Sequence, residues 1–303
     1  MVSPLVVSLK KQKKFYGSKI TIFSPAKINL YLNIIGEYQD PALGGKSFHQ
    51  LESIVERLSL RDLITIKIKK KPAVEIFSNI KSLKNPKNLC VRAVNLLREK
   101  FRIPFGFDII LKKKIPIGSG LGGGSSNAAS TLIGMNSLLN LGLDKSDLYK
   151  FGAFLGSDVN FFLSESKFAF LEGRGECITP LDIDTRFNHL IIWPGIQLST
   201  RRVYEHARVK LTKFFNNVKI IRYALKKADI FLLQKNTFNA LERAAFSACY
   251  ALEKVKKRLE KEGVFSQLTG SGSSFYTIGE MPSVSKLRRI LPKQWLIFKV
   301  QTF

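Results

Sequence analysis

The sequence predicts an α+β protein built from two domains. Three observations support this prediction: a length of 303 residues of which 45% are hydrophobic, segments in which apolar residues occupy alternate positions, and segments with apolar residues at helical spacing. The strand-like and helix-like segments do not alternate regularly, which favours a mixed arrangement over a regular α/β one. A chain of this length buries a large core, so disordered, collagen-like and disulfide-scaffold proteins are excluded.

Strands are predicted where apolar and polar residues alternate. They cover residues 27–34, 64–68, 105–111, 168–180 (with a turn), 189–193, 275–278 and 295–300. The first is expected to be half-buried, with Lys27 and Asn29 together on its polar face. After it, Ser47-Phe48-His49 is expected to open a helix that continues to about Arg57. Another helix is expected over residues 145–155, ending at Gly156.

The N-terminal residues 1–19 are predicted to form a basic, mobile extension. The apolar patch Leu5–Leu9 is followed by lysines rather than preceded by them, which does not fit a signal peptide. No apolar run approaches the ~18 residues that a membrane-spanning helix needs. Cys90, Cys177 and Cys249 are too far apart for a zinc pattern or a disulfide framework. We therefore expect a cytoplasmic protein.

The net charge of +26 raises the question of nucleic-acid binding. Residues 61–114 carry 15 Lys and Arg against 4 Asp and Glu, whereas residues 115–166 carry 2 against 4. The glycine-rich segment described next lies in the second region, and within residues 61–114 basic runs occur only at residues 69–71 and 112–114. This distribution of the surplus Lys and Arg residues therefore favours a generally basic, solvated surface. Attraction for anionic ligands or RNA stays an alternative.

A glycine-rich segment follows the strand of residues 105–111. Five of the seven residues from 118 to 124 are glycine, although the whole chain has only 21. A helix should follow, with Gly142 placed to end it and an apolar face made of Ala128, Leu132, Met135 and Leu139. A strand, a glycine loop and a helix N-terminus in this order offer free backbone N–H groups and a positive dipole end to an anion. We therefore predict a phosphate-binding loop; a flexible turn without a ligand is the weaker alternative.

Two familiar phosphate loops fit the segment poorly. The P-loop is excluded because Gly124 is followed by Ser125 and Ser126 instead of lysine. The pattern G-x-G-x-x-G does occur over residues 118–123, but a dinucleotide fold also needs an acidic residue at the end of a second strand. Asp144 has the right spacing for that residue, and yet it is expected to start a helix.

The glycine-rich segment and four others resemble the GHMP kinase superfamily, whose ATP loop reads Pro-x-Gly-x-Gly-Leu-Gly followed by small residues. The matching segments are Ser24–Leu30, Pro116–Ser126, Leu155–Val159, Phe170–Glu176 and Leu268–Gly272. The resemblance covers nearly the whole chain after the extension. It implies the two-domain GHMP kinase fold, with a ribosomal-protein-like ATP-binding domain over residues 20–184 and a C-terminal α/β sandwich domain over residues 185–303.

The resemblance also implies an activity and its ligands. The expected reaction is ATP-dependent phosphorylation of a small-molecule alcohol, here the 2-hydroxyl of a cytidine diphosphate ester of methylerythritol. Mg²⁺ is expected to arrive with ATP rather than in a protein metal site. A mevalonate-type or homoserine-type kinase is the nearer alternative, and an RNA-binding protein is the more distant one. The nucleotide is assigned to Pro116, Ile117, Gly118, Ser119, Gly120, Leu121, Gly122, Gly123, Gly124, Ser125 and Ser126.

The superfamily's catalytic pair corresponds to Lys27 and Asp158. An aspartate can orient the acceptor hydroxyl and take its proton late in phosphoryl transfer. A lysine can neutralise charge on the γ-phosphate, and Asn29 on the same strand face can add a hydrogen bond to the substrate. Without the resemblance, Asp158 reads as a helix N-cap and Lys27 as a solvated strand residue. Gly270 and Gly272 are expected to shape the floor of the site, although an ordinary β-turn is an alternative.

Recognition of the cytosine is assigned to three rings. Phe48 and Tyr204 are expected to stack on the two faces of the base, and His49 to bind its edge. The chain departs from the superfamily segment at Ser47, where that segment has glycine. The alternative is that Phe48 belongs to the core and His49 caps a helix.

Overall fold

The computed structural model describes residues 15–40, 46–207, 217–279 and 282–303, without the side chains of residues 38–40 and 46–48. Most of the predicted extension over residues 1–19 therefore lies outside the described residues. Cys90, Cys177 and Cys249 are all free, as their spacing predicted. Within the described ranges no helix combines the length and apolarity that a membrane crossing requires. A cytoplasmic location stays a prediction.

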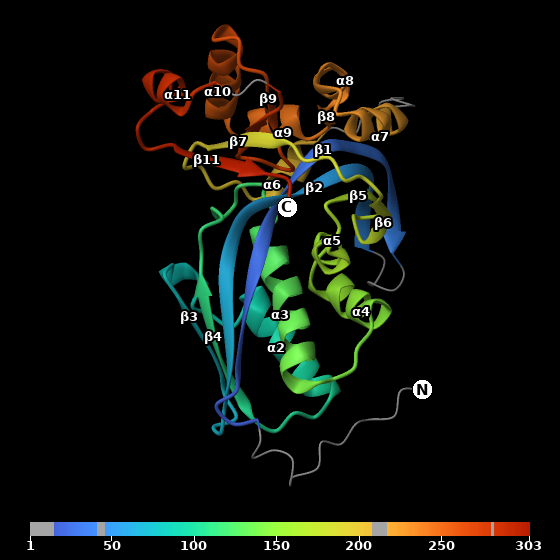
Figure 1. The fold of residues 1–303 in the computed structure, drawn as a ribbon, viewed down its shortest axis with the longest axis vertical. Coiled ribbons are helices and arrows are strands. Elements are labelled where there is room, and N and C mark those ends of the chain that lie inside the picture. Colours follow the sequence, from blue (N-terminus) through green and yellow to red (C-terminus); the bar gives the residue numbers. More distant parts are fainter. Residues whose placement is uncertain (1–14, 41–45, 208–216, 280–281) are drawn as a thin grey trace. The chain divides into compact units, whose positions relative to one another are not determined.

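Helices and strands are mixed without regular alternation, so the predicted α+β class is confirmed (Figure 1). The strands are β1 (Lys19–Asp40), β2 (Lys46–Lys69), β3 (Val74–Ser78), β4 (Gly106–Lys112), β5 (Phe168–Glu172), β6 (Cys177–Leu181), β7 (Asn188–Trp193), β8 (Phe238–Asn239), β9 (Ser266–Leu268), β10 (Phe275–Thr277) and β11 (Leu296–Gln301). The helices are η2 (Lys81–Leu83), α2 (Leu89–Lys100), α3 (Gly123–Leu139), α4 (Lys145–Leu155), α5 (Val159–Ser164), α6 (Thr200–His206), α7 (Asn217–Lys227), α8 (Ile230–Asn236), α9 (Glu242–Ala248), α10 (Tyr250–Lys261) and α11 (Val284–Ile290).

The chain packs into two compact units, each assembled from separate segments. Unit 1 comprises residues 1–25, 61–115 and 123–165, and unit 2 comprises residues 26–60, 116–122 and 166–303. Because β1 and β2 are long strands, each contributes residues to both units. The family domains assigned to residues 20–184 and 185–303 describe a different division and stay a prediction.

Unit 1 contains a sheet with helices beside it (Figure 1). β4 pairs antiparallel with the end of β2 and parallel with β3. The predicted apolar face of α3 is confirmed, since Ala128, Leu132, Met135 and Leu139 are all buried. The helix ends at Leu139, before the expected stop at Gly142, because Asn140 already adopts a left-handed conformation with φ of 49°. Helix α4 matches its prediction and ends at Gly156.

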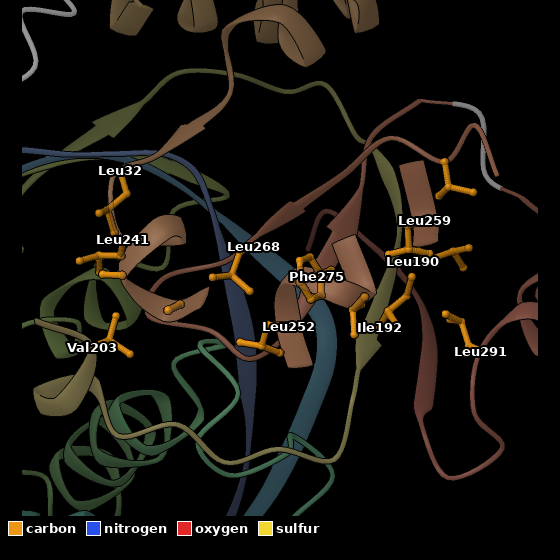
Figure 2. Packing of buried hydrophobic residues seen from close by; sticks show 14 of the residues in the cluster. Leu32, Leu190, Ile192, Val203, Leu241, Leu252, Leu259, Leu268, Phe275 and Leu291 are labelled. Atoms are coloured by element: carbon orange, nitrogen blue, oxygen red, sulfur yellow. The ribbon is translucent and has the colours of Figure 1, made fainter. Parts of the chain in front are cut away.

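Unit 2 contains a four-stranded sheet in the order β11-β7-β10-β9, and a hydrophobic core formed with its helices. The strands predicted near β5, β6, β7, β10 and β11 are confirmed. Figure 2 shows the core side chains, which include Leu190 and Ile192 from β7, Phe275 from β10, and Leu252 and Leu259 from α10. In the same unit, β5 pairs with β2 and with β6, and β8 runs parallel to β1.

The helix predicted from Ser47 to Arg57 is wrong, because these residues belong to β2. Residues Ser53–Glu56 pair antiparallel with Phe168–Leu171 of β5. Ser53 and Val55 lie on one face and Ile54 and Glu56 on the other, and all four are buried. A strand that is buried on both faces lacks the apolar–polar alternation from which strands are recognised.

The first strand also differs from its prediction as a half-buried strand. Residues 24–34 of β1 are all buried, including the polar side chains at every second position. These polar side chains therefore line an enclosed region rather than a solvated face, and they form the starting point of the candidate site.

Candidate active site

Lys27 and Asn29 form a buried polar pair on β1. Their side chains are 4% and 3% exposed, and the Nζ of Lys27 donates a hydrogen bond to the Oδ1 of Asn29. The prediction that both side chains project from one face is confirmed. The alternative of a solvated strand lysine is wrong, because a side chain this buried does not have a solvated ammonium. A buried ammonium is costly unless polar groups compensate it, which is typical of a functional position.

Asn29 is itself fixed by groups from three other elements of unit 2. Its Nδ2 donates to the Oγ of Ser53, 2.9 Å away, and its backbone N–H donates to the Oγ1 of Thr269 at 3.0 Å. The hydroxyl of Tyr276 donates to the backbone oxygen of Asn29 at 3.0 Å. Burial raises the pKa of Tyr276 well above its ordinary value of 10.0, so this hydroxyl stays protonated and can donate. These contacts fix the position of the Asn29 Oδ1, which accepts the hydrogen bond from Lys27.

The sequence interpretation missed Ser53, Thr269 and Tyr276 as supports of the lysine. Thr269 belongs to a segment already singled out, Leu268–Gly272, so its position in the motif was an available signal. Ser53 lies in the segment that was predicted to be a helix, where its side chain would have had other neighbours. Tyr276 is an aromatic residue of a predicted strand, and nothing in the pattern separates its hydroxyl from an ordinary core residue.

The glycine loop, residues 116–126, passes directly beside Lys27. Within unit 2 the backbone N–H of Lys27 donates to the oxygen of Leu121 at 3.0 Å. Gly120 has a φ of +79°, and a Cβ at this position would lie 2.1 Å from the oxygen of Thr269. No other residue type fits there without moving the backbone. The loop and the turn that contains Thr269 are therefore packed backbone against backbone.

The turn at residues 269–274 connects β9 to β10 and completes this cluster. Its Ser274 N–H donates to the oxygen of Ser119 at 3.0 Å. A Cβ at Gly270 would lie 3.5 Å from the Nζ of Lys27. Two loops separated by about half of the chain thus enclose the lysine, which supports a role for Gly270 and Gly272 in shaping the site.

Helix α3 begins at Gly123, inside the glycine loop. In its first turn, the side chains of Ser125 and Ser126 differ in burial. Ser126 is fully buried, and its Oγ accepts a hydrogen bond from the Oγ of Ser24 at 2.8 Å. Ser125 is half-buried, and a Cβ at Gly156 would lie 3.8 Å from its Oγ. The turn before α5 therefore lies beside the start of α3, within unit 1.

Asp158 occupies the N-cap position of α5, as the alternative interpretation of its motif proposed, but its side chain does not accept a capping hydrogen bond. The N-cap of the preceding helix α4 behaves differently, because the Oδ1 of Asp144 accepts from the N–H of Asp147 at 2.8 Å. Capping of α5 is therefore not the role of the Asp158 carboxylate. Asp158 belongs to unit 1 and Lys27 to unit 2, and their action as a pair stays a prediction.

The residues predicted to recognise the base contain an aromatic stack. The rings of His49 and Tyr204 are stacked, with centroids 4.9 Å apart and planes at 18°. The Nδ1 of His49 also lies 3.2 Å from the Oε1 of Glu37. His49 is in strand β2, so the alternative that it caps a helix is wrong. The side chain of Phe48 lies outside those described, and its stacking on the base stays a prediction.

The segment before α6 connects this stack to the glycine loop. The N–H of Leu198 donates to the oxygen of Gly118 at 3.1 Å. The hydroxyls of Thr200 and Ser271 share a hydrogen bond of 3.0 Å. Unit 2 therefore gathers a buried lysine, residues 116–122 of the glycine loop and a stacked aromatic pair from segments that are far apart in the sequence.

Comparison with known proteins gives a family. Residues 88–165 match the family model for the GHMP kinases N terminal domain. The chain is 34% identical over 287 residues to a 4-diphosphocytidyl-2-C-methyl-D-erythritol kinase from Polynucleobacter asymbioticus, and the match covers 91% of each chain.

Solved structures give the fold. A crystal structure of 4-(cytidine 5'-diphospho)-2C-methyl-D-erythritol kinase matches with a TM-score of 0.72 and 27% identity, covering 93% of this chain and 99% of that one. A homoserine kinase from Cytophaga hutchinsonii matches with a TM-score of 0.68 over 94% of each chain. At 18% identity, this second likeness shows the fold alone.

Proposed function

The chain belongs to the 4-diphosphocytidyl-2-C-methyl-D-erythritol kinase family, and from this we propose that it phosphorylates the 2-hydroxyl of 4-diphosphocytidyl-2-C-methyl-D-erythritol. It has the two-domain GHMP kinase fold and is an ATP-dependent kinase of isoprenoid precursor biosynthesis. The products are ADP and the 2-phosphate. The observation that carries the proposal is the buried ammonium of Lys27, held by Asn29 beside the backbone of the glycine loop.

ATP binding is assigned to the glycine loop and the start of α3. Glycine lets an anion approach the backbone N–H groups of the loop closely, and α3 adds the positive end of its dipole at Gly123, where the helix begins. The close packing of Gly120 on Thr269 fixes the loop before the nucleotide arrives. Less conformational entropy is then lost on binding.

In the proposed reaction the acceptor hydroxyl oxygen attacks the γ-phosphorus, and the bond from this phosphorus to the β–γ bridging oxygen breaks. The bridging oxygen leaves with ADP, and the hydroxyl proton passes to the carboxylate of Asp158. An aspartate is a weak base, so the proton moves late, once the new P–O bond is forming. Lys27 stabilises the negative charge on the transferred group.

Mg²⁺ is proposed to enter bound to ATP. Such an ion takes most of its ligands from phosphate and water. Among the described residues, no group of three or more His, Cys, Asp and Glu side chains could hold a metal ion. The half-buried hydroxyl of Ser125 would add one oxygen ligand from the first turn of α3. When bound, the ion neutralises charge on the β- and γ-phosphates.

The cytidine of the acceptor is assigned to Phe48, His49 and Tyr204. The ring of Tyr204 is suited to stacking on a pyrimidine, and in this structure it is stacked on the ring of His49. His49 has ring nitrogens for the edge of the base. Asn29 is proposed to act mainly through Lys27, because its Oδ1 and Nδ2 hydrogen-bond with Lys27 and Ser53.

An ADP-release assay tests the proposal when ATP, Mg²⁺ and the acceptor are omitted in turn. We expect ADP only when all three are present. Mevalonate or homoserine in place of the acceptor should give no ADP above background. Release with either of them, and none with the cytidine diphosphate ester, would show that the chain is a different GHMP kinase.

A further inference from the structure

A buried carboxylate in unit 1 connects both ends of the glycine loop. Asp62 is 0% exposed. Its Oδ1 accepts hydrogen bonds from the backbone N–H of Lys114 at 2.7 Å and of Ile115 at 2.9 Å. Its Oδ2 accepts from the Nζ of Lys113 and, at 2.9 Å, from the Nδ2 of Asn127. Every donor except Asn127 directly precedes the loop, and Asn127 follows it in the first turns of α3.

The same network continues into the loop itself. The Nδ2 of Asn127 also donates to the Oγ of Ser24 at 2.8 Å, and Ser24 donates to the Oγ of Ser126. The Nζ of Lys113 makes a further bond of 3.2 Å to the Oδ1 of Asn127. Asp62 thus reaches a serine of the predicted nucleotide site through two intermediate side chains.

Lys113 was expected on a solvated basic surface, and the structure corrects this. It is 8% exposed, and a Cβ at Gly123 would lie 2.9 Å from its Nζ. The ammonium is therefore at the N-terminal end of α3, where a cation opposes the helix dipole. The carboxylate of Asp62 offsets this charge. Asn79 fixes the backbone of Lys113 from the other side, through hydrogen bonds of 2.8 and 3.0 Å.

We propose that Asp62 is a positioning residue for ATP: it ties the strand end before the glycine loop to the first turns of α3 and so holds the loop in its binding conformation. This inference rests on the proposed function, in which the loop binds ATP. Asp62 touches no reacting atom in this account. Its effect is expected on the affinity for nucleotide, because a loop whose two ends are not fixed must be ordered when ATP binds.

The test compares Asp62→Asn with wild-type enzyme. Asparagine keeps the size of the side chain, but its NH₂ group would replace an acceptor that faces two donors, Lys113 and Asn127. We expect the dissociation constant of a non-hydrolysable ATP analogue, measured by calorimetry, and the KM for ATP to rise about tenfold or more. The KM for the acceptor should stay within about twofold.

Glu56→Gln is the matched control. Glu56 is also a fully buried carboxylate, and its oxygens lie 3.1 Å from the Nε2 of the buried His189 in unit 2. This variant should lose thermal stability and keep its affinity for the ATP analogue. If it weakens analogue binding as much as Asp62→Asn does, the effect is a general loosening and the proposal is overturned.

Asn127→Ala gives a second test that leaves the pair of Asp62 and Lys113 intact. It removes the link from Asp62 to α3, together with the hydrogen bonds of Asn127 to Ser24 and Lys113, and we expect a smaller rise in the same dissociation constant. This variant tests the proposal if Asp62→Asn does not fold. Wild-type affinity in Asn127→Ala, and in Asp62→Asn where that variant folds, would overturn the proposal. Turnover by the wild-type enzyme tests the proposed function separately. A failure of the proposed function can therefore be distinguished from a failure of the proposal about Asp62.

Discussion

The Nζ of Lys27 donates a hydrogen bond to the Oδ1 of Asn29, two positions further along the same strand, and both side chains are buried. Asn29→Ala removes this acceptor, and with it one of the contacts that position the ammonium. Because the lysine acts by stabilising charge in the transition state, we expect kcat to fall about 100-fold while the KM for ATP changes little. Steady-state kinetics measure both. A kcat within twofold of wild type would show that Asn29 does not position the lysine.

Asp158 and Asp144 offer a comparison between two aspartates at helix N-caps. Asp158→Ala should lower kcat by about 10²–10⁴-fold, the range for a residue that accepts a proton in the transition state. Binding of an ATP analogue should persist. The N-cap of α5 loses no hydrogen bond in this variant, because the Asp158 side chain does not accept one from the helix.

Asp144→Ala should give the opposite result. It removes a capping hydrogen bond of 2.8 Å, so about 1 kcal/mol of stability should be lost. Its kcat should stay at the wild-type value. If Asp158→Ala turned over at the wild-type rate, Asp158 would have no part in the chemistry.

Tyr204 should determine affinity for the acceptor and not for ATP. Replacing it with alanine removes a ring face worth roughly 1–3 kcal/mol of base stacking, so the KM for the acceptor should rise about 10–100-fold. Tyr204→Phe keeps the face and should stay close to wild type. An equal rise of the KM for ATP in Tyr204→Ala would indicate a general disturbance of the site instead of base recognition.

His189 and Glu56 form a buried pair that should make stability depend on pH. Burial alone lowers the pKa of His189, but the charge of Glu56 and hydrogen bonds to Glu56 and to the oxygen of Thr277 outweigh it, and the pKa is raised above 6.5. A histidine with a raised pKa stabilises the folded state fully below its unfolded pKa, and this contribution is lost as the pH rises through the folded pKa.

The difference in unfolding free energy between wild type and Glu56→Gln should therefore be largest near pH 6, at roughly 2–3 kcal/mol, and should shrink as the pH rises. Denaturant unfolding at several pH values measures it. A difference that stays constant from pH 6 to pH 9 would contradict the raised pKa of His189.

Local signals in the sequence predicted much of the fold. The helix at residues 145–155 was placed correctly because Asp144 and Gly156 mark its two ends. The glycine loop and α3 were predicted for the same reason, since glycine and apolar spacing are local properties. The segment from Ser47 to Arg57 was misassigned because its burial depends on β5, more than 100 residues away. A strand that is buried by tertiary pairing of this kind does not show alternating apolar and polar residues in its sequence.

The candidate site shows the same limit. Lys27 and Asn29 could be placed on one strand face from alternation alone. Their burial, and the hydrogen bonds of Asn29 with Thr269 and Tyr276, depend on residues about 240 positions away. Asp62 gave one available signal, because it is an isolated acid in a strongly basic stretch. Its partners Lys113 and Asn127 could not be inferred without the fold.

Phosphorus NMR of the complete reaction tests the central claim most directly. With ATP, Mg²⁺ and 4-diphosphocytidyl-2-C-methyl-D-erythritol, a new phosphate monoester signal should appear, with one monoester formed for each ADP, while the diphosphate signals of the acceptor persist. ADP accompanied only by inorganic phosphate, or no ADP at all, would contradict phosphoryl transfer to this acceptor.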